Sequence, residues 1–127
     1  MNGDMLDTNV IIKYLAGDNS AKLLVNNASN PSVSVIVVGE LYFGAQKSSR
    51  TETNLALFSS FLTNFAIIPV DNQIAAVYGI VKEQLRAKGA NIPENDIWIA
   101  ATAMSQKNRL LTYDAHFKSV DGLNVAP

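Results

Sequence analysis

Four acidic residues stand where neither a turn nor a polar helix face readily explains them. Asp7 directly follows a short apolar segment, and Glu40 interrupts the apolar stretch VIVVGELYFG. Asp96 stands near the start of the apolar segment NDIWIAATA, and Asp114 directly follows LLTY. Carboxylates that are brought together raise one another's pKa, so such a cluster is expected only where a cation neutralises it. Carboxylate oxygens without His or Cys ligands favour Mg²⁺ or Mn²⁺.

Each of these four acids also has a structural alternative. Asp7 can cap a helix, Asp96 can lie in a first helical turn where negative charge is favoured, and Asp114 can begin a turn. Glu40 fits a capping box less well, because Val37 three residues earlier has no hydroxyl group. These alternatives are independent of one another, whereas one metal site accounts for all four positions. The remaining acids are assigned to turns, loops, helix starts, polar helix faces and the far end of a strand: Asp4, Asp18, Glu52, Asp71, Glu83, Glu94 and Asp121.

Short apolar strands alternate with helices along the chain. Strands are expected at residues 4–7, 33–36, 66–70, 109–113 and 123–125, with those at 33–36 and 66–70 buried. Helices are expected at residues 8–15, 20–28, around 40–44, 51–65, 72–88 and 95–107. The expected helix caps are Thr8 or Asn9, Asp71 and Asn95. This pattern predicts an α/β fold with a parallel sheet covered on both faces, in which ligands bind beyond the carboxyl ends of the strands.

The composition limits the possible classes of function. The 127 residues, of which 48% are hydrophobic, suit a single domain spanning residues 1–127. The net charge is −1, so binding of nucleic acid would need clustered cations or bound metal ions. The absence of cysteine excludes disulfides and thiolate zinc sites, and the start of the chain lacks the pattern of a signal peptide, as expected of a cytoplasmic protein. No apolar stretch reaches the roughly 20 residues of a membrane span, so no membrane association is expected.

Four sequence blocks occur in the order and at the separations typical of a known family: DTNVII, GELYFGA, NDIWIAATA and LLTYDAHF. In these blocks the chain resembles the PIN-domain nucleases, and specifically the VapC-type toxins of bacterial toxin–antitoxin pairs, over almost its whole length. The resemblance implies a three-layer α/β/α fold with a central parallel sheet. It also implies an endoribonuclease that uses one or two Mg²⁺ or Mn²⁺ ions, cleaves transfer or ribosomal RNA and so inhibits translation. An antitoxin partner and a homodimer are implied as well.

The acidic residues of this family correspond to the four acids singled out above. The resemblance places catalytic and metal-binding roles on Asp7, Glu40, Asp96 and Asp114, and supporting roles on Asn9 and Thr112. In this scheme the aspartates hold metal, whereas Glu40 either holds metal or positions and deprotonates the attacking water. The sequence departs from the family at Val37, where Ser or Thr is common, and at Tyr113, where Asn is common. The departures leave the surroundings of the ligands and the substrate contacts undefined.

Several alternatives remain open from the sequence. A PIN nuclease of RNA processing, outside toxin–antitoxin systems, and an inactive PIN domain are alternatives within the fold, although an inactive domain is not expected to keep all four acids. A phospho-receiver domain has a similar length and an acidic Mg²⁺ pocket, but adjacent acids are expected after its first strand, where only Asp7 stands. A haloacid-dehalogenase-like phosphatase needs a second acid where Asn9 stands. His116 is the only histidine, which excludes a two-histidine mechanism, and we expect it to be structural; we expect Trp98 to pack in the core or in a dimer.

Overall fold

A parallel β-sheet forms the centre of the molecule. In the computed structural model, which describes residues 2–127, five strands are hydrogen-bonded in the order β3-β2-β1-β4-β5. Their bounds are Asp4–Leu6 (β1), Ser32–Ser34 (β2), Ala66–Ile68 (β3), Arg109–Leu111 (β4) and Val125–Ala126 (β5). Every neighbouring pair is parallel, so all the carboxyl ends lie at one edge of the sheet. The predicted parallel sheet is confirmed.

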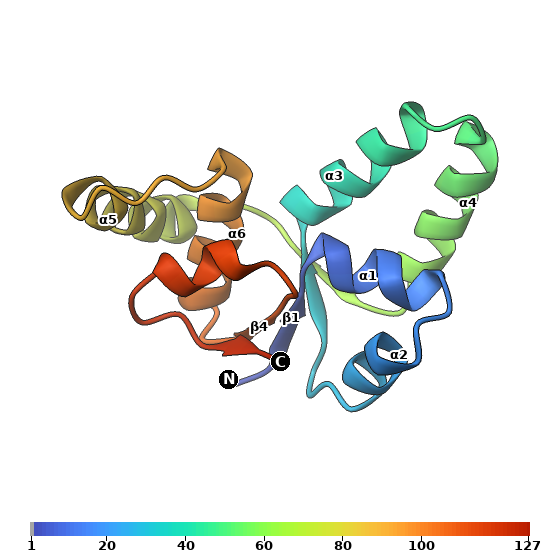
Figure 1. Cartoon of the computed structure of the whole chain (residues 1–127), viewed down its shortest axis with the longest axis horizontal. Helices are drawn as coiled ribbons and strands as arrows, with labels where there is room; N and C mark the ends of the chain where they lie inside the picture. The colour runs from blue at the N-terminus through green and yellow to red at the C-terminus, as the bar shows by residue number, and fades with distance from the viewer. Residues whose placement is uncertain (1) are drawn as a thin grey trace.

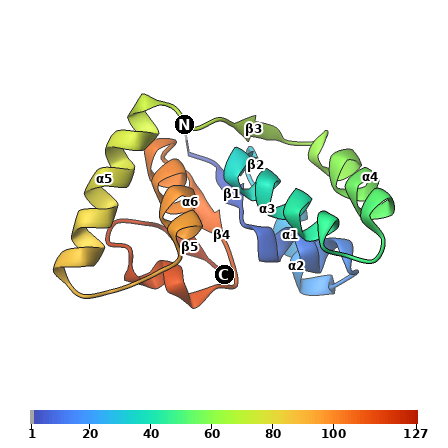
Figure 2. The ribbon, with the colours of Figure 1, turned by 90° about the horizontal axis from the view of Figure 1, so that it is seen from above.

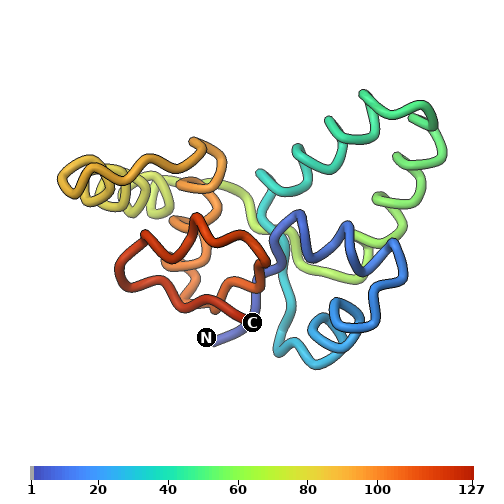
Figure 3. The backbone as a smooth tube through the Cα atoms, viewed as in Figure 1, coloured from blue at the N-terminus to red at the C-terminus, as the bar shows by residue number. Residues whose placement is uncertain are grey.

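Helices cover both faces of this sheet. They span Thr8–Leu15 (α1), Asn19–Asn26 (α2), Val35–Gln46 (α3), Thr51–Leu62 (α4), Asn72–Ala87 (α5) and Glu94–Ser105 (α6), and a short 3₁₀ helix, η1, spans Ala115–Ser119. Figure 1 and Figure 2 show α1 to α4 on one side of the sheet and α5 and α6 on the other. Figure 3 traces the light green segment after α4, which crosses from the first side to the second. This is the three-layer α/β/α arrangement that the resemblance implies, and within residues 2–127 no helix is both long and apolar enough to cross a membrane.

The hydrophobic core lies on both faces of the central strands. The strand residues with no exposed surface are Met5, Leu6, Val33, Ser34, Leu110 and Leu111. Phe58, Phe61 and Leu62 of α4 pack into the same core, so these apolar side chains of the helix are buried within the chain. Trp98 of α6 stacks on Tyr78 of α5 with ring centroids 3.8 Å apart, which fixes these two helices against each other.

Two strands differ from the prediction. The prediction of a buried strand at residues 66–70 is wrong: β3 ends at Ile68, and Ile67 is 40% exposed, because β3 is an edge strand. Of the residues 33–36 predicted as a strand, only Val33 and Ser34 belong to β2, because α3 begins at Val35. The chain turns there because the Ser34 hydroxyl accepts a hydrogen bond from the Ile36 N–H at 3.1 Å and caps α3.

The first helix is capped by Asp7. Its Oδ1 accepts a hydrogen bond from the Thr8 N–H at 2.8 Å. The prediction that Thr8 or Asn9 caps this helix is wrong, because Asp7 is the last residue with extended backbone and α1 already begins at Thr8. The cap occupies one oxygen atom of Asp7 and leaves the side chain at the carboxyl edge of the sheet.

Three other helix starts test the sequence assignments. Asp71 caps α5 as predicted, accepting a hydrogen bond from the Ile74 N–H at 2.9 Å. Asp18, assigned to a turn, also caps α2. The prediction that Asn95 caps the last helix is wrong, because α6 begins at Glu94 directly after Pro93, which has no polar side chain to act as a cap.

Candidate active site

The four predicted acids converge at the carboxyl edge of the sheet. Asp7 follows β1, and Asp114 follows the neighbouring strand β4. Glu40 lies in α3, which follows β2, and Asp96 lies in the first turn of α6. All four line one open hollow of about 390 Å³. Elements that are far apart in the sequence therefore place their carboxylates around a common space.

Asp7 is held by the two polar residues predicted to support it. Thr112 donates a hydrogen bond from its hydroxyl to Asp7 Oδ2 at 2.7 Å, and the Asn9 amide donates to the same oxygen at 3.3 Å. Asn9 also donates to the Thr112 hydroxyl at 3.4 Å. The Thr112 hydroxyl further accepts the Asp114 N–H at 3.0 Å, so it links the two strand-end aspartates. These bonds fix the Asp7 carboxylate, which is 4% exposed, in one orientation.

Replacing Thr112 by valine should lower the free energy of unfolding by about 1 kcal/mol. The change keeps the shape of the side chain but removes the donor to Asp7 and the acceptor of the Asp114 N–H. Urea unfolding at neutral pH measures the effect, and Thr112→Ser, which keeps the hydroxyl, is the matched control. Equal loss of stability in both variants would contradict a role for the hydroxyl.

Both carboxylate oxygens of Glu40 are held by hydrogen bonds. The Thr8 hydroxyl donates to Oε1 at 2.7 Å, and the Asn95 amide donates to Oε2 at 3.3 Å. Thr8 and Asn95 were predicted only as helix caps, so the sequence analysis missed their contacts with Glu40. Asn95 is 55 residues from Glu40 in the chain, and no local pattern in the sequence indicates such a contact.

His116 lies at the rim of the acid cluster. Its Nδ1 is 3.4 Å from Asp96 Oδ2 and 3.1 Å from Asp114 Oδ1, and its backbone N–H donates to Asp114 Oδ1 at 2.9 Å. One possible ligand atom from each of these three residues lies within 4.8 Å of the others. The expectation that His116 is only structural is therefore incomplete. The available signal was its position two residues after Asp114, where the turn of η1 brings the ring back to the carboxylate.

Burial and mutual repulsion raise the pKa of two of these acids. Loss of solvation is the largest cause for Asp7, and it outweighs the hydrogen bonds from Thr112 and Thr8, which lower the pKa. Loss of solvation and the negative charges of Asp7 and Asp114 raise the pKa of Asp96 to about 6, against a weaker opposing hydrogen bond with His116. The charged forms of these carboxylates are therefore unfavourable side by side.

The donor set fits a hard divalent cation. Oxygen atoms of several carboxylates around one hollow are the ligands that Mg²⁺ and Mn²⁺ prefer. A cation there would offset the repulsion that raises the pKa of Asp7 and Asp96. The only lysine or arginine among the described residues lining the hollow is Lys13, and within residues 2–127 it forms no ion pair with a carboxylate. The cluster thus has the ligand chemistry of a metal site, and within the described residues no lysine or arginine forms an ion pair with its four acids.

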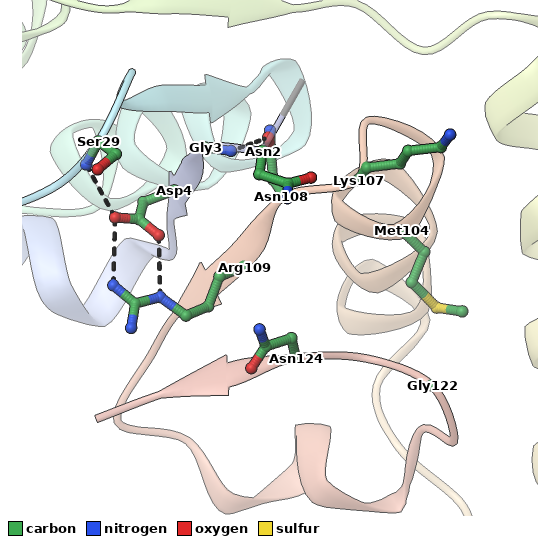
Figure 4. Close-up of a pocket in the computed structure, with 10 residues that line it drawn as sticks. All are labelled: Asn2, Gly3, Asp4, Ser29, Met104, Lys107, Asn108, Arg109, Gly122 and Asn124. Atoms are coloured by element: carbon green, nitrogen blue, oxygen red, sulfur yellow. Dashed lines mark hydrogen bonds and ion pairs between the residues drawn. The ribbon is translucent and has the colours of Figure 1, made fainter.

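Asp4 lies at the opposite edge of the sheet, as expected. Its carboxylate pairs with the Arg109 guanidinium at 2.9 and 3.2 Å and accepts the Ser29 N–H at 2.9 Å. Figure 4 shows this pair on the wall of a separate hollow at the amino ends of β1 and β4. Because Asp4 has its own cation, it contributes no unpaired charge and is distinct from the acids of the site.

Comparison with known proteins identifies similar sequences. A model of the PIN domain matches residues 5–123 of this chain. Ribonuclease VapC2 of Haemophilus influenzae is 41% identical over 105 residues, which cover 80% of this chain and 79% of the relative. The tRNA(fMet)-specific endonuclease VapC of Salmonella typhimurium is 29% identical over 124 residues, which cover 95% of this chain and 94% of the relative.

A solved structure extends this similarity to three dimensions. The crystal structure of VapBC2 from Rickettsia felis, bound to a DNA fragment from their promoter, contains a chain that is 30% identical to this one. The two chains superpose with a TM-score of 0.89 over 99% of this chain and 98% of the other. The phospho-receiver and haloacid-dehalogenase alternatives are therefore set aside. The chain belongs to the PIN-domain family and, within it, to the VapC ribonucleases.

Proposed function

We propose that this chain is a metal-dependent endoribonuclease and the toxin component of a type II toxin–antitoxin pair. The observation that carries the proposal is the gathering of four carboxylates around one hollow at the carboxyl edge of the sheet. The relatives support RNA as the substrate, because one is a ribonuclease and the other is a tRNA(fMet)-specific endonuclease. Hydrolysis of phosphodiester bonds in transfer or ribosomal RNA in the cytoplasm would inhibit translation.

Three aspartates are assigned to metal binding in this proposal. Asp7, Asp96 and Asp114 would hold one or two Mg²⁺ or Mn²⁺ ions. When bound, such ions activate water and neutralise negative charge on the reacting phosphodiester. Thr112 and Asn9 keep the Asp7 carboxylate in a fixed orientation through their hydrogen bonds.

Glu40 is assigned to the attacking water. The hydrogen bonds from Thr8 and Asn95 hold its carboxylate in place, so it can orient a water molecule and accept a proton from it. The water oxygen then bonds to phosphorus while the bond from phosphorus to the 3′-oxygen of the preceding nucleotide breaks, and the departing 3′-oxygen takes up a proton from solvent. The products expected from this reaction carry a 5′-phosphate and a 3′-hydroxyl group.

A cognate antitoxin and a homodimer complete the proposal. An antitoxin that covers the acidic hollow with a cationic side chain would replace the charge of the metal. The Rickettsia felis structure, which is of VapBC2, supports the existence of such a partner protein. Transfer RNA is the first substrate to test, because the Salmonella relative is named as specific for tRNA(fMet). Sedimentation of the isolated chain at micromolar concentration tests the dimer, which a pure monomer would contradict.

The purified chain should cut total RNA in the presence of Mg²⁺. Addition of EDTA should stop the reaction, excess Mg²⁺ should restore it, and Asp7→Asn should be inactive under all conditions. Ligation-based sequencing of the fragments measures both the cut sites and the chemistry of the ends. Cleavage that persists in EDTA, or an Asp7→Asn variant with the wild-type rate, would contradict the proposal.

A further inference from the structure

Tyr113 presents an aromatic ring beside the acid cluster. It stands between Thr112 and Asp114, and its backbone N–H donates to Asn9 Oδ1 at 3.0 Å. Tyr113 is nevertheless 37% exposed, so its ring is not fully buried in the core. The family resemblance gives no role to an aromatic residue here, because Asn is common at this position. The ring is thus positioned by the same Asn9 that supports Asp7, but it remains available to a ligand.

Lys13 links this ring to the acidic hollow. Its Nζ lies 5.5 Å from the centroid of the Tyr113 ring, and the residue also lines the hollow with the four acids. Lys13 and Asn9 are four residues apart in α1 and therefore lie on one face of the helix. That face holds the Tyr113 backbone through Asn9 and places a cation over the ring through Lys13. Lys13, which has no carboxylate partner among residues 2–127, therefore lies near the ring and also lines the hollow that contains the acids.

A second hollow begins at Tyr113, away from the acids. Its volume is about 540 Å³, and its lining combines the Tyr113 ring with apolar groups of α2 and a few polar groups: Ser20, Leu23, Leu24, Asn27, Arg109, Tyr113 and Pro127. Leu23 is 64% exposed, so the apolar wall is open to solvent. An aromatic side chain, aliphatic walls and the side-chain amide of Asn27 suit a nucleobase, which has two apolar faces and a polar edge.

We infer that Tyr113, Lys13 and this hollow form a subsite for one unpaired nucleotide of the RNA substrate. The base stacks on Tyr113 within the hollow, and Lys13 contacts a phosphate between that base and the scissile bond. Charge favours this path: the chain is acidic overall, and Lys13 is the only lysine or arginine among the described residues lining the hollow that contains the acids. Only a base outside a duplex can expose its face to the ring, so the subsite selects single-stranded RNA. The inference deepens the proposed function and rests on RNA being the substrate.

RNA binding tests the subsite without cleavage. The parent protein carries Asp96→Asn, and the probe is a fluorescently labelled single-stranded RNA of about 12 nucleotides of mixed sequence, in Mg²⁺. Adding Tyr113→Ala should weaken binding by about 10-fold, and Tyr113→Phe should restore it to within about twofold. Lys13→Met should make the dependence of log Kd on log salt shallower by about 0.7, the effect of one phosphate contact on a single strand. Lys107→Met removes the same charge at the opposite edge of the sheet and should leave affinity unchanged.

Two results would overturn the inference. One is equal affinity of the parent and Tyr113→Ala, including a lack of binding by both, which is also the result expected if this surface serves only a protein partner. The other is equal competition by the fully paired duplex of the same sequence. In the cleaving protein, Tyr113→Ala should also change the base preference at one position beside the mapped cut. Failure of the wild-type chain to cut any RNA would refute the proposed function, whereas a cutting enzyme that is indifferent to Tyr113 would refute the subsite alone.

Discussion

Replacing Asp96 by asparagine is expected to reduce RNA cleavage on the order of 1,000-fold and, at the same time, to stabilise the metal-free protein. Removal of one carboxylate takes away a proposed metal ligand, and several kcal/mol of transition-state stabilisation correspond to a loss of this size. The same carboxylate destabilises the fold, because its pKa is raised to about 6 by burial and by the neighbouring charges of Asp7 and Asp114. The neutral amide avoids both the desolvation and the repulsion.

The gain in stability follows from the size of the pKa shift. A rise from 3.8 to about 6 corresponds to at most about 3 kcal/mol, and because solvent screens part of the repulsion we expect a gain of about 1–3 kcal/mol at pH 7.5. Urea unfolding in EDTA measures the stability, and single-turnover cleavage in Mg²⁺ measures the activity. Asp121→Asn is the matched control, because Asp121 is exposed and pairs with Lys88 far from the acid cluster. Full activity of Asp96→Asn in Mg²⁺, or a less stable metal-free variant, would contradict the assignment.

The convergence of the acids was predictable because it depends on topology alone. Apolar segments without a two-residue period predict parallel strands, and parallel strands bring their carboxyl ends to one edge. Asp7 directly follows β1, and Asp114 lies three residues beyond the end of β4; the two strands pair in the register Leu6 with Leu111. No side-chain detail is needed to bring those two carboxylates together. The same reasoning correctly separated Asp4, which lies three residues before Asp7 at the other end of β1.

The contacts that orient the acids were not predictable in the same way. Asn95 reaches Glu40 from another helix, and its distance along the chain exceeds any local period. Thr8 was read as a helix cap because hydroxyl residues favour that position, but in the structure its hydroxyl bonds Glu40 while Asp7 takes the cap. Local preference ranks residue types for a position, whereas the tertiary structure decides which oxygen a given donor meets. The burial of β3 was predicted wrongly for the same reason. The apolar segment AIIPV does not indicate whether its strand lies at the centre or at the edge of the sheet.

In the absence of divalent cations, the free energy of unfolding is expected to be higher at pH 5 than at pH 7.5. The folded-state pKa of Asp96, about 6, lies above the ordinary value of 3.8, so between these values the folded chain binds more protons than the unfolded chain. Stability therefore falls as pH rises through about 6, and the raised pKa of Asp7 acts in the same direction. For Asp96 the difference between pH 7.5 and pH 5 amounts to about 1 kcal/mol, and Asp7 adds to it.

Magnesium should reverse this order. Cations and protons compete for the same carboxylates, so Mg²⁺ at about 100 times its Kd should add about 3 kcal/mol at pH 7.5 and much less at pH 5. Thermal and urea unfolding at the two pH values, with Mg²⁺ and with EDTA, give the four stabilities that are needed. Because His116 contacts both Asp96 and Asp114, the comparison uses chains in which His116 is replaced by glutamine.

Adding Asp96→Asn to the His116→Gln chain distinguishes the contribution of the acid cluster to the pH dependence of stability from that of every other titrating group. The variant should lose most of the pH dependence seen in EDTA, because it removes the carboxyl group whose pKa is raised to about 6. It should also lose most of the stabilisation by Mg²⁺ at pH 7.5. If the double variant keeps the pH dependence that the His116→Gln parent shows in EDTA, the instability at neutral pH arises elsewhere in the chain. If the double variant is stabilised by Mg²⁺ as much as the His116→Gln parent is, the cation binds away from Asp96, and the acids at the carboxyl edge do not form the metal site.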